Sequence, residues 1–111
     1  MIEAAVIWRE LQQELSHAYP FGNAHGINSQ NIVDFLLEVP VLRKFKYVGG
    51  PNQFEFIEAW IVLDECKESE SQGYLIAYYP ERRMYGLAVK ADPFPAFIGC
   101  YGSLVETIVA M

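Results

Sequence analysis

The sequence predicts an α+β domain in which helices pack on one face of a small antiparallel sheet. Three observations predict this class: helical spacing in two segments within residues 2–39, three aromatic and β-branched runs within residues 54–90, and a capping motif near the end of the chain. The expected order is two N-terminal helices, a three-stranded antiparallel meander and a C-terminal helix. A chain of 111 residues without linkers or repeats is expected to form one domain over residues 1–111.

The first expected element is an amphipathic helix over residues 2–19. Apolar side chains recur there at spacings of three and four, which is typical of a surface helix with one buried stripe. These positions are Ala4, Trp8, Leu11, Leu15 and Ala18. Pro20 ends the helix, and a loop rich in glycine and asparagine is expected over residues 20–29.

A second helix is expected after this loop. Asn28 or Ser29 is placed to cap its start, and Pro40 ends it, because the residue before a proline avoids helical geometry. Its inward-facing residues would be Ile32, Val33, Leu36 and Leu37. Residues 41–46 are expected to add a short helical turn, and residues 49–52 to form a break before the sheet.

Three strands are expected next. Residues 54–63 are rich in β-branched and aromatic side chains, although their alternation is imperfect. Either both faces of this strand are partly covered, or a bulge shifts the phase near residue 57. Residues 73–79 and 84–90 predict the other two strands, and the compact turn over residues 80–83 joins them in an antiparallel hairpin.

The chain is expected to end in a short helix. Two prolines within residues 92–95 exclude regular helix and central strand there. Ser103 and Glu106 then fit the capping box, in which each side chain binds the backbone of the other residue. All three helices are expected to pack on one face of the meander.

Composition indicates a soluble protein of the cytoplasm with a substantial apolar core. Hydrophobic residues make up 52% of the chain, yet its longest apolar run, residues 59–63, is too short to cross a membrane. The N-terminus lacks the basic and apolar segments of a secretory signal peptide. A net charge of −6 argues against binding to nucleic acid or to an anionic membrane surface.

The sequence contains no motif for catalysis, cofactor binding or metal binding. The glycine-rich phosphate signatures and HExxH are absent, and His17 and His25 are not spaced as metal ligands. Cys66 and Cys100 belong to no metal motif and are expected to be free thiols. We therefore expect no cofactor, no metal and no catalytic residues, which favours a protein that is not an enzyme.

The predicted hairpin is the leading candidate for a binding surface. It concentrates Tyr78, Tyr79 and Tyr85 beside Arg82 and Arg83. Tyrosine and arginine are enriched at protein interfaces and among the residues that dominate their affinity. This pattern favours a protein-interaction or regulatory module that binds a protein partner or a second copy of the chain.

His25 is a second candidate binding residue, in the loop over residues 20–29. Histidine exchanges protons near neutral pH, and loops on rigid scaffolds often carry function. This alternative is a small ligand-binding domain or enzyme whose pocket is lined by the loop. A third alternative is an acidic inhibitor or immunity-type protein, on the basis of the net charge and the acidic residues 64–70.

Overall fold

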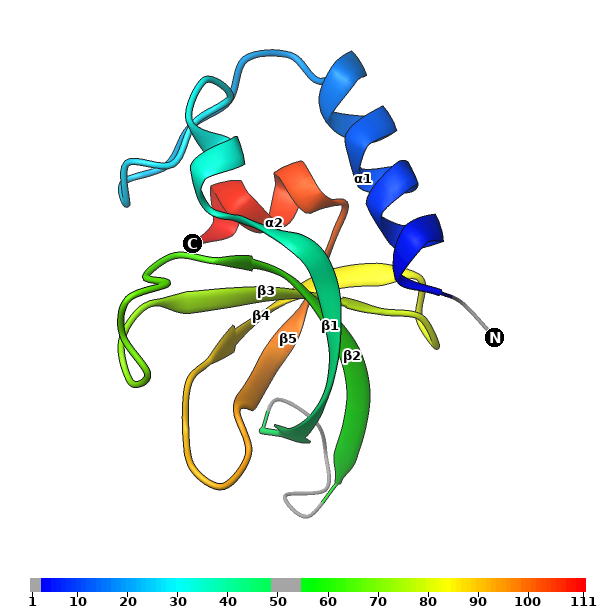
Figure 1. The fold of residues 1–111 in the computed structure, drawn as a ribbon, viewed down its shortest axis with the longest axis vertical. Helices are drawn as coiled ribbons and strands as arrows, with labels where there is room; N and C mark the ends of the chain where they lie inside the picture. The colour runs from blue at the N-terminus through cyan, green and yellow to red at the C-terminus, as the bar shows by residue number, and fades with distance from the viewer. Residues whose placement is uncertain (1–2, 49–54) are drawn as a thin grey trace.

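The computed structural model describes residues 3–48 and 55–111, which contain two α-helices and five strands (Figure 1). The helices are α1 (Ala4–His17) and α2 (Leu104–Ala110), with one short 3-10 helix, η1 (Ile32–Asp34). The strands are β1 (Leu36–Tyr47), β2 (Phe56–Asp64), β3 (Tyr74–Tyr79), β4 (Met84–Val89) and β5 (Ala96–Gly102). Within the described ranges, neither helix has the length and apolar character needed to span a bilayer.

The five strands close into a barrel in sequence order. Neighbouring strands run antiparallel from β1 through β5. Because the strand direction alternates and the number of strands is odd, β5 meets β1 in parallel. This closing contact is short and joins Lys46 to Ala96 and Tyr47 to Phe97. The barrel is therefore tightly closed only where β1 ends.

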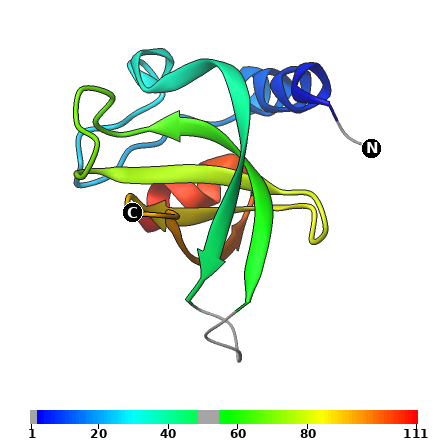
Figure 2. The same cartoon turned by 60° about the horizontal axis from the view of Figure 1, so that its bottom comes forward.

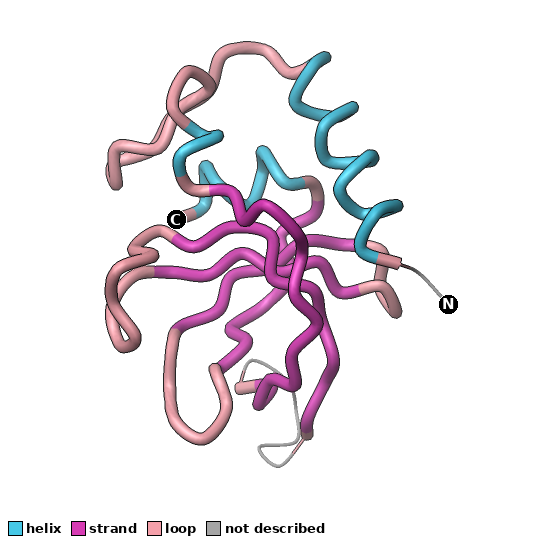
Figure 3. Tube along the Cα trace, in the orientation of Figure 1, coloured by secondary structure: helices cyan, strands magenta, loops and turns pink. Residues whose placement is uncertain are grey.

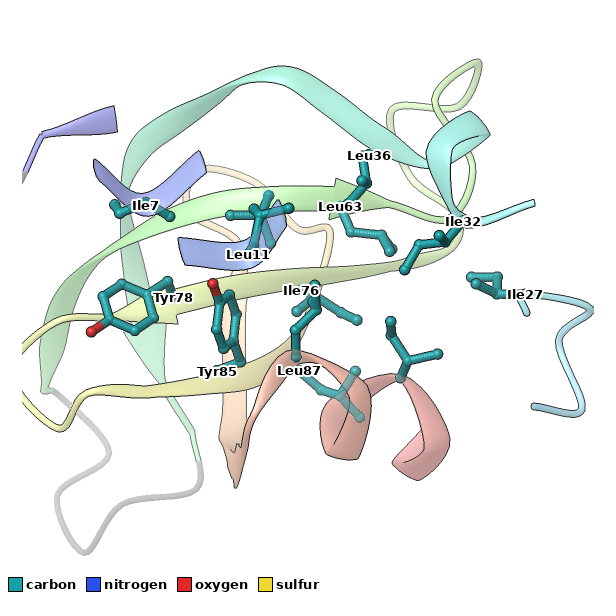
Figure 4. Close-up of a cluster of buried hydrophobic side chains, with 13 residues drawn as sticks. Ile7, Leu11, Ile27, Ile32, Leu36, Leu63, Ile76, Tyr78, Tyr85 and Leu87 are labelled. Atoms are coloured by element: carbon teal, nitrogen blue, oxygen red, sulfur yellow. The ribbon is translucent and has the colours of Figure 1, made fainter. Parts of the chain in front are cut away.

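The sheet separates two apolar cores. Alternate side chains of a strand point to opposite faces, so on β3 Leu75, Ala77 and Tyr79 face the barrel interior, whereas Ile76 and Tyr78 face outward. The interior core consists of Phe45, Tyr47, Ile57, Ala59, Ile61, Leu75, Ala77, Tyr79, Ala88 and Phe97. The outer core lies under the helices, and Figure 4 shows part of it. Both faces of the sheet are thus covered over much of their area.

Both α-helices lie on the same side of the strands (Figure 3). α1 contacts β1 and α2, and α2 contacts β3, β4 and β5. The amphipathic helix predicted over residues 2–19 is confirmed, with bounds Ala4–His17. Its buried residues are Leu11, which belongs to the predicted stripe, and Ile7, which does not. The capping box of α2 is also confirmed, since Ser103 Oγ accepts from the Glu106 amide and Ser103 N donates to Glu106 Oε1.

The prediction of a second N-terminal helix is wrong. The chain forms only the single turn of η1 and then enters β1. Residues 41–46, expected to be a helical turn, pair in regular register with β2. This ladder joins segments distant in sequence, so the local pattern of apolar residues did not reveal it. Pro40 lies where the register shifts between Leu36 and Val41, a position that tolerates proline within a strand.

The prediction of a three-stranded meander is also wrong, although both α-helices do lie on one face of the sheet. The three predicted strands correspond to β2, β3 and β4, while β1 and β5 extend the sheet to five strands and close it. Of the two alternatives for the first predicted strand, the covering of both faces is confirmed, since β2 contributes Val62 and Leu63 to the outer core and Ile57, Ala59 and Ile61 to the interior. Among the described residues no bulge lies near residue 57, and the register shift of β2 with β3 lies between Ile61 and Leu63. The break predicted over residues 49–52 falls outside the described residues. So do residue 2, where the first predicted helix begins, and residue 54, where the first predicted strand begins.

Candidate functional site

A cavity opens at the barrel end where β1 and β5 have separated. Its volume is about 490 Å³, within the range of about 300–1,000 Å³ that is usual for small-molecule sites. It is lined by Leu37, Val41, Arg43, Ile61, Asp64, Lys67, Ser69, Glu70, Leu75, Lys90, Ala91, Asp92 and Pro95. We call this site the barrel mouth.

The floor of the barrel mouth is apolar. Val41 of β1, Ile61 of β2 and Leu75 of β3 contribute side chains from three neighbouring strands. Below this floor, Phe45 is fully buried and packs edge-on against Phe97, with ring centroids 5.9 Å apart. The interior of a small barrel is filled by its own side chains in this way, so the cavity is confined to one end of the barrel.

Lys90 holds the rim of the barrel mouth in place. Its Nζ lies 2.8 Å from Asp64 Oδ1 and donates to the carbonyl oxygens of Cys66 at 2.8 Å and Ser69 at 2.6 Å. An ammonium group has three donors, and here it has three acceptors. Only 10% of the Lys90 side chain is exposed, so its ammonium group binds the loop between β2 and β3 and is not free to bind a ligand.

Two further cations line the rim. Lys67 Nζ donates to the Leu36 carbonyl at 2.7 Å and ties the same loop to the start of β1. Arg43 lies on the inward-facing side of β1, in line with Val41 and Phe45, and is exposed. Among residues 3–48 and 55–111, no carboxylate lies within 4.0 Å of the Arg43 guanidinium. Arg43 is thus the rim cation best placed to meet a bound anion.

His25, the predicted loop residue, does not line the barrel mouth but contacts Glu65, the first residue after β2. Its Nδ1 is 2.6 Å from Glu65 Oε2, and its ring packs edge-on against Tyr74 at 5.5 Å between centroids. Glu65 Oε1 accepts from the Tyr74 amide at 2.9 Å. A smaller cavity of about 290 Å³ adjoins this pair and reaches Lys90.

Asn23 explains why His25 sits there. Its Oδ1 accepts from the amides of His25 and Ile27, which folds the loop into a tight turn. Its Nδ2 donates to the Ile108 carbonyl at 2.9 Å and anchors that turn to α2. The sequence could not show this anchor, since it spans 85 positions.

The chemistry available to His25 is limited to an oriented imidazole. Glu65 fixes the ring, as a carboxylate does in many acid–base pairs. Within the described part of the chain, His25 makes no hydrogen bond to a hydroxyl or thiol, and no cluster of three His, Cys, Asp or Glu side chains could hold a metal. A functional role for His25 stays a prediction, while its structural role is to join two loops.

The five hairpin candidates do not share one surface. Tyr78 and Tyr85 are buried in the outer core, with ring centroids 5.0 Å apart, and Tyr79 is buried in the barrel interior. Only Arg82 and Arg83 are exposed, at the turn between β3 and β4. Because the sheet is covered on both faces, the two arginines are the exposed members of this set, and a binding role for the hairpin stays a prediction.

The buried tyrosines are neutral at physiological pH. Burial raises the pKa of Tyr79 to about 12, and the hydrogen bond from its hydroxyl to Glu81 Oε2 adds to the shift. Burial also raises the pKa values of Tyr78 and Tyr85. Protonated phenols packed in a core stabilise the fold and offer no reactive group.

The residues of the barrel mouth were missed in the sequence because they come from three strands and two loops that are separate in the chain. One signal was present: Asp64 and Lys90 each follow an apolar strand core, and these two positions form the rim ion pair. No family model, curated protein or solved structure matches the chain. Function is therefore inferred from the geometry of the sites themselves.

Proposed function

We propose that the protein is a small ligand-binding domain whose site is the barrel mouth. The observation that carries this proposal is a cavity of about 490 Å³ with an apolar floor and a rim of fixed charges. Ligand sites combine an apolar lining with a few placed polar groups, and the mouths of β-barrels are a recurrent location for them. The ligand-binding role considered from the sequence is retained, but the proposed site is the barrel mouth and not the loop over residues 20–29.

The charges on the rim indicate the class of ligand. Lys90 and Asp64 neutralise each other, whereas the Arg43 guanidinium can form two parallel hydrogen bonds to a carboxylate or a similar anion. Glu70 and Asp92 also line the rim and would repel a ligand with several negative charges. A small molecule with an apolar body and a single anionic group fits this arrangement.

Titration of the labelled protein with decanoate, followed by NMR of the backbone amides, tests the proposal. The amides that shift should cluster around Leu37, Val41 and Leu75. Decanol and decylamine should bind more weakly, because they cannot pair with Arg43. Substitution Arg43→Gln should weaken decanoate binding about tenfold, the effect of one charge-assisted hydrogen bond.

Two variants serve as controls. Val41→Trp places a bulky indole ring at a half-exposed position of the floor and should abolish decanoate binding by filling the barrel mouth. Arg82→Gln removes the same charge at the remote hairpin turn and should leave binding unchanged. Decanoate that binds Val41→Trp as tightly as the original protein would place the ligand elsewhere and refute the proposal.

A further inference from the structure

β1 has a long unpaired edge. It pairs with β2 along much of its length, but with β5 only at Lys46 and Tyr47. Figures 1 and 2 show β1 (teal) beside β2 at the front of the barrel. Over residues 41–44 the opposite edge of β1 meets no other strand within the described ranges. An unpaired strand edge presents a row of backbone donors and acceptors.

The direction of the backbone groups can be derived from their neighbours. The amides of Lys46 and Val48 donate to carbonyl groups at Pro95 and Phe97, on the β5 side. Alternate residues of a regular strand direct their backbone groups to the same side. The N–H and C=O groups of Leu42 and Lys44 therefore point to the open edge, where no acceptor among the described residues receives these amides.

The side chains beside this edge are exposed and apolar or basic. The exposed fractions are 61% for Val39, 45% for Val41 and 45% for Leu42, which is high for aliphatic residues in a strand. Arg43, Lys44 and Lys46 are three of the eight basic residues in a chain whose net charge is −6. The edge is thus a basic and apolar stripe on an acidic protein.

The charge of Lys44 is available to a partner. Glu58 lies opposite Lys44 on β2, yet no ion pair within 4.0 Å joins them. Lys44 Nζ instead lies over the rings of Phe56 and Phe94, at 4.7 Å and 5.4 Å from their centroids. Such cation–π contacts hold a side chain in place and keep its charge.

We propose that residues 41–46 of β1 form a strand-pairing site for an extended acidic segment of a partner protein. Addition of a strand to a sheet edge derives affinity from main-chain hydrogen bonds and specificity from alternate side chains. Acidic side chains would meet Lys44 and Lys46 on the outer face and Arg43 on the inner face, with apolar residues against Val41 and Leu42. This surface shares Val41 and Arg43 with the barrel mouth, but it does not depend on the proposed ligand.

Two other occupants fit less well. A second copy of the chain would bring the same basic stripe against itself, and like charges on paired strands are destabilising. Pro40 and the register shift beside it also prevent the edge from being extended by a long identical strand. A nucleic acid would be repelled by the net charge of −6 and has no peptide groups to pair with the strand.

The probe is a fluorescent seven-residue peptide in which valine and glutamate alternate, with both ends blocked. Its affinity for the full chain is measured by fluorescence anisotropy. A version with lysine in place of glutamate should bind at least about tenfold more weakly, because its charges oppose those of the stripe. Methylation of the backbone nitrogens on one edge of the glutamate peptide should also abolish binding.

Matched charge reversals locate the site on the protein. Lys44→Glu should lower the affinity for the glutamate peptide about tenfold. Arg82→Glu makes the same change in net charge at the hairpin turn and should leave this affinity unchanged. Decanoate binding should be unchanged in Lys44→Glu, which separates this site from the barrel mouth. Equal affinity for both peptides, insensitivity to N-methylation, or self-association that Lys44→Glu abolishes would overturn the proposal.

Discussion

At the scale of single residues, close packing inside the barrel decides which side chains are allowed. Gly86 of β4 faces the interior, where an added Cβ would lie 2.4 Å from the Gly99 carbonyl oxygen and 2.4 Å from Phe97 Cζ. Phe97 is fully buried and also packs against Tyr47 and Tyr79. Gly99 of β5 lies close by, but an added Cβ there would meet nothing within 4 Å.

This difference predicts a large loss of stability for one alanine substitution and almost none for the other. Gly86→Ala should lower the free energy of unfolding by about 3 kcal/mol, since the backbone of β5 and the ring of Phe97 must both move. Gly99→Ala should change it by about 0.5 kcal/mol or less. Urea denaturation of both variants checks this. Equal stability would mean that the barrel interior can readily rearrange around Phe97.

At the scale of elements, one loop is held by side chains from several parts of the chain. The segment between β2 and β3 is bound by Lys90, which follows β4, and by the contact between His25 and Glu65. Lys67, within the loop, reaches back to the start of β1. The loop has no apolar core of its own, and these polar contacts hold it over the barrel mouth.

The two lysines should differ in their importance for this loop. Lys90→Met leaves Asp64, whose side chain is 17% exposed, without its partner and should lower the free energy of unfolding by about 3 kcal/mol. Lys67→Met removes one hydrogen bond at an exposed position and should cost about 1 kcal/mol. Hydrogen exchange should show faster opening of residues 65–72 in Lys90→Met. Equal effects of the two variants would contradict the central role of Lys90.

At the scale of the whole molecule, two cores on either side of one sheet bury several phenol groups. Burial raises the pKa of Tyr79 from 10.0 to about 12. Between these values the folded protein keeps a proton that the unfolded chain has released. Unfolding therefore releases a proton in this window, so stability is retained below pH 10 and is lost as the pH rises towards 12.

Tyr79→Phe should flatten this alkaline loss of stability. Each such tyrosine contributes a slope of about 1.4 kcal/mol per pH unit within the window. At neutral pH the variant should be about 1 kcal/mol less stable, because it lacks the hydrogen bond to Glu81. Between pH 8 and pH 11 its free energy of unfolding should fall by less than that of the original protein. Urea denaturation at pH 8, 10 and 11 measures both effects. Tyr19→Phe, at a position 89% exposed, is the control that should leave the slope unchanged.

Local signals predicted the elements whose structure depends on near neighbours. The apolar spacing of α1, the capping box of Ser103 and Glu106, and the hairpin turn over residues 80–83 each lie within a few residues of sequence. The candidate sites were harder to predict. The pairing of His25 with Glu65 spans 40 positions, and the residues of the barrel mouth meet only after closure.

Sequence patterns alone were enough to predict the α+β class, the first and last helices and the three central strands, because helix period, caps and strand alternation are local properties. Tertiary structure alone decided that residues 36–47 form a strand, because their hydrogen bonds come from β2, and that β5 closes the barrel. Closure also decided which faces are buried. It placed the hairpin tyrosines in the cores and left the barrel mouth and the edge of β1 exposed.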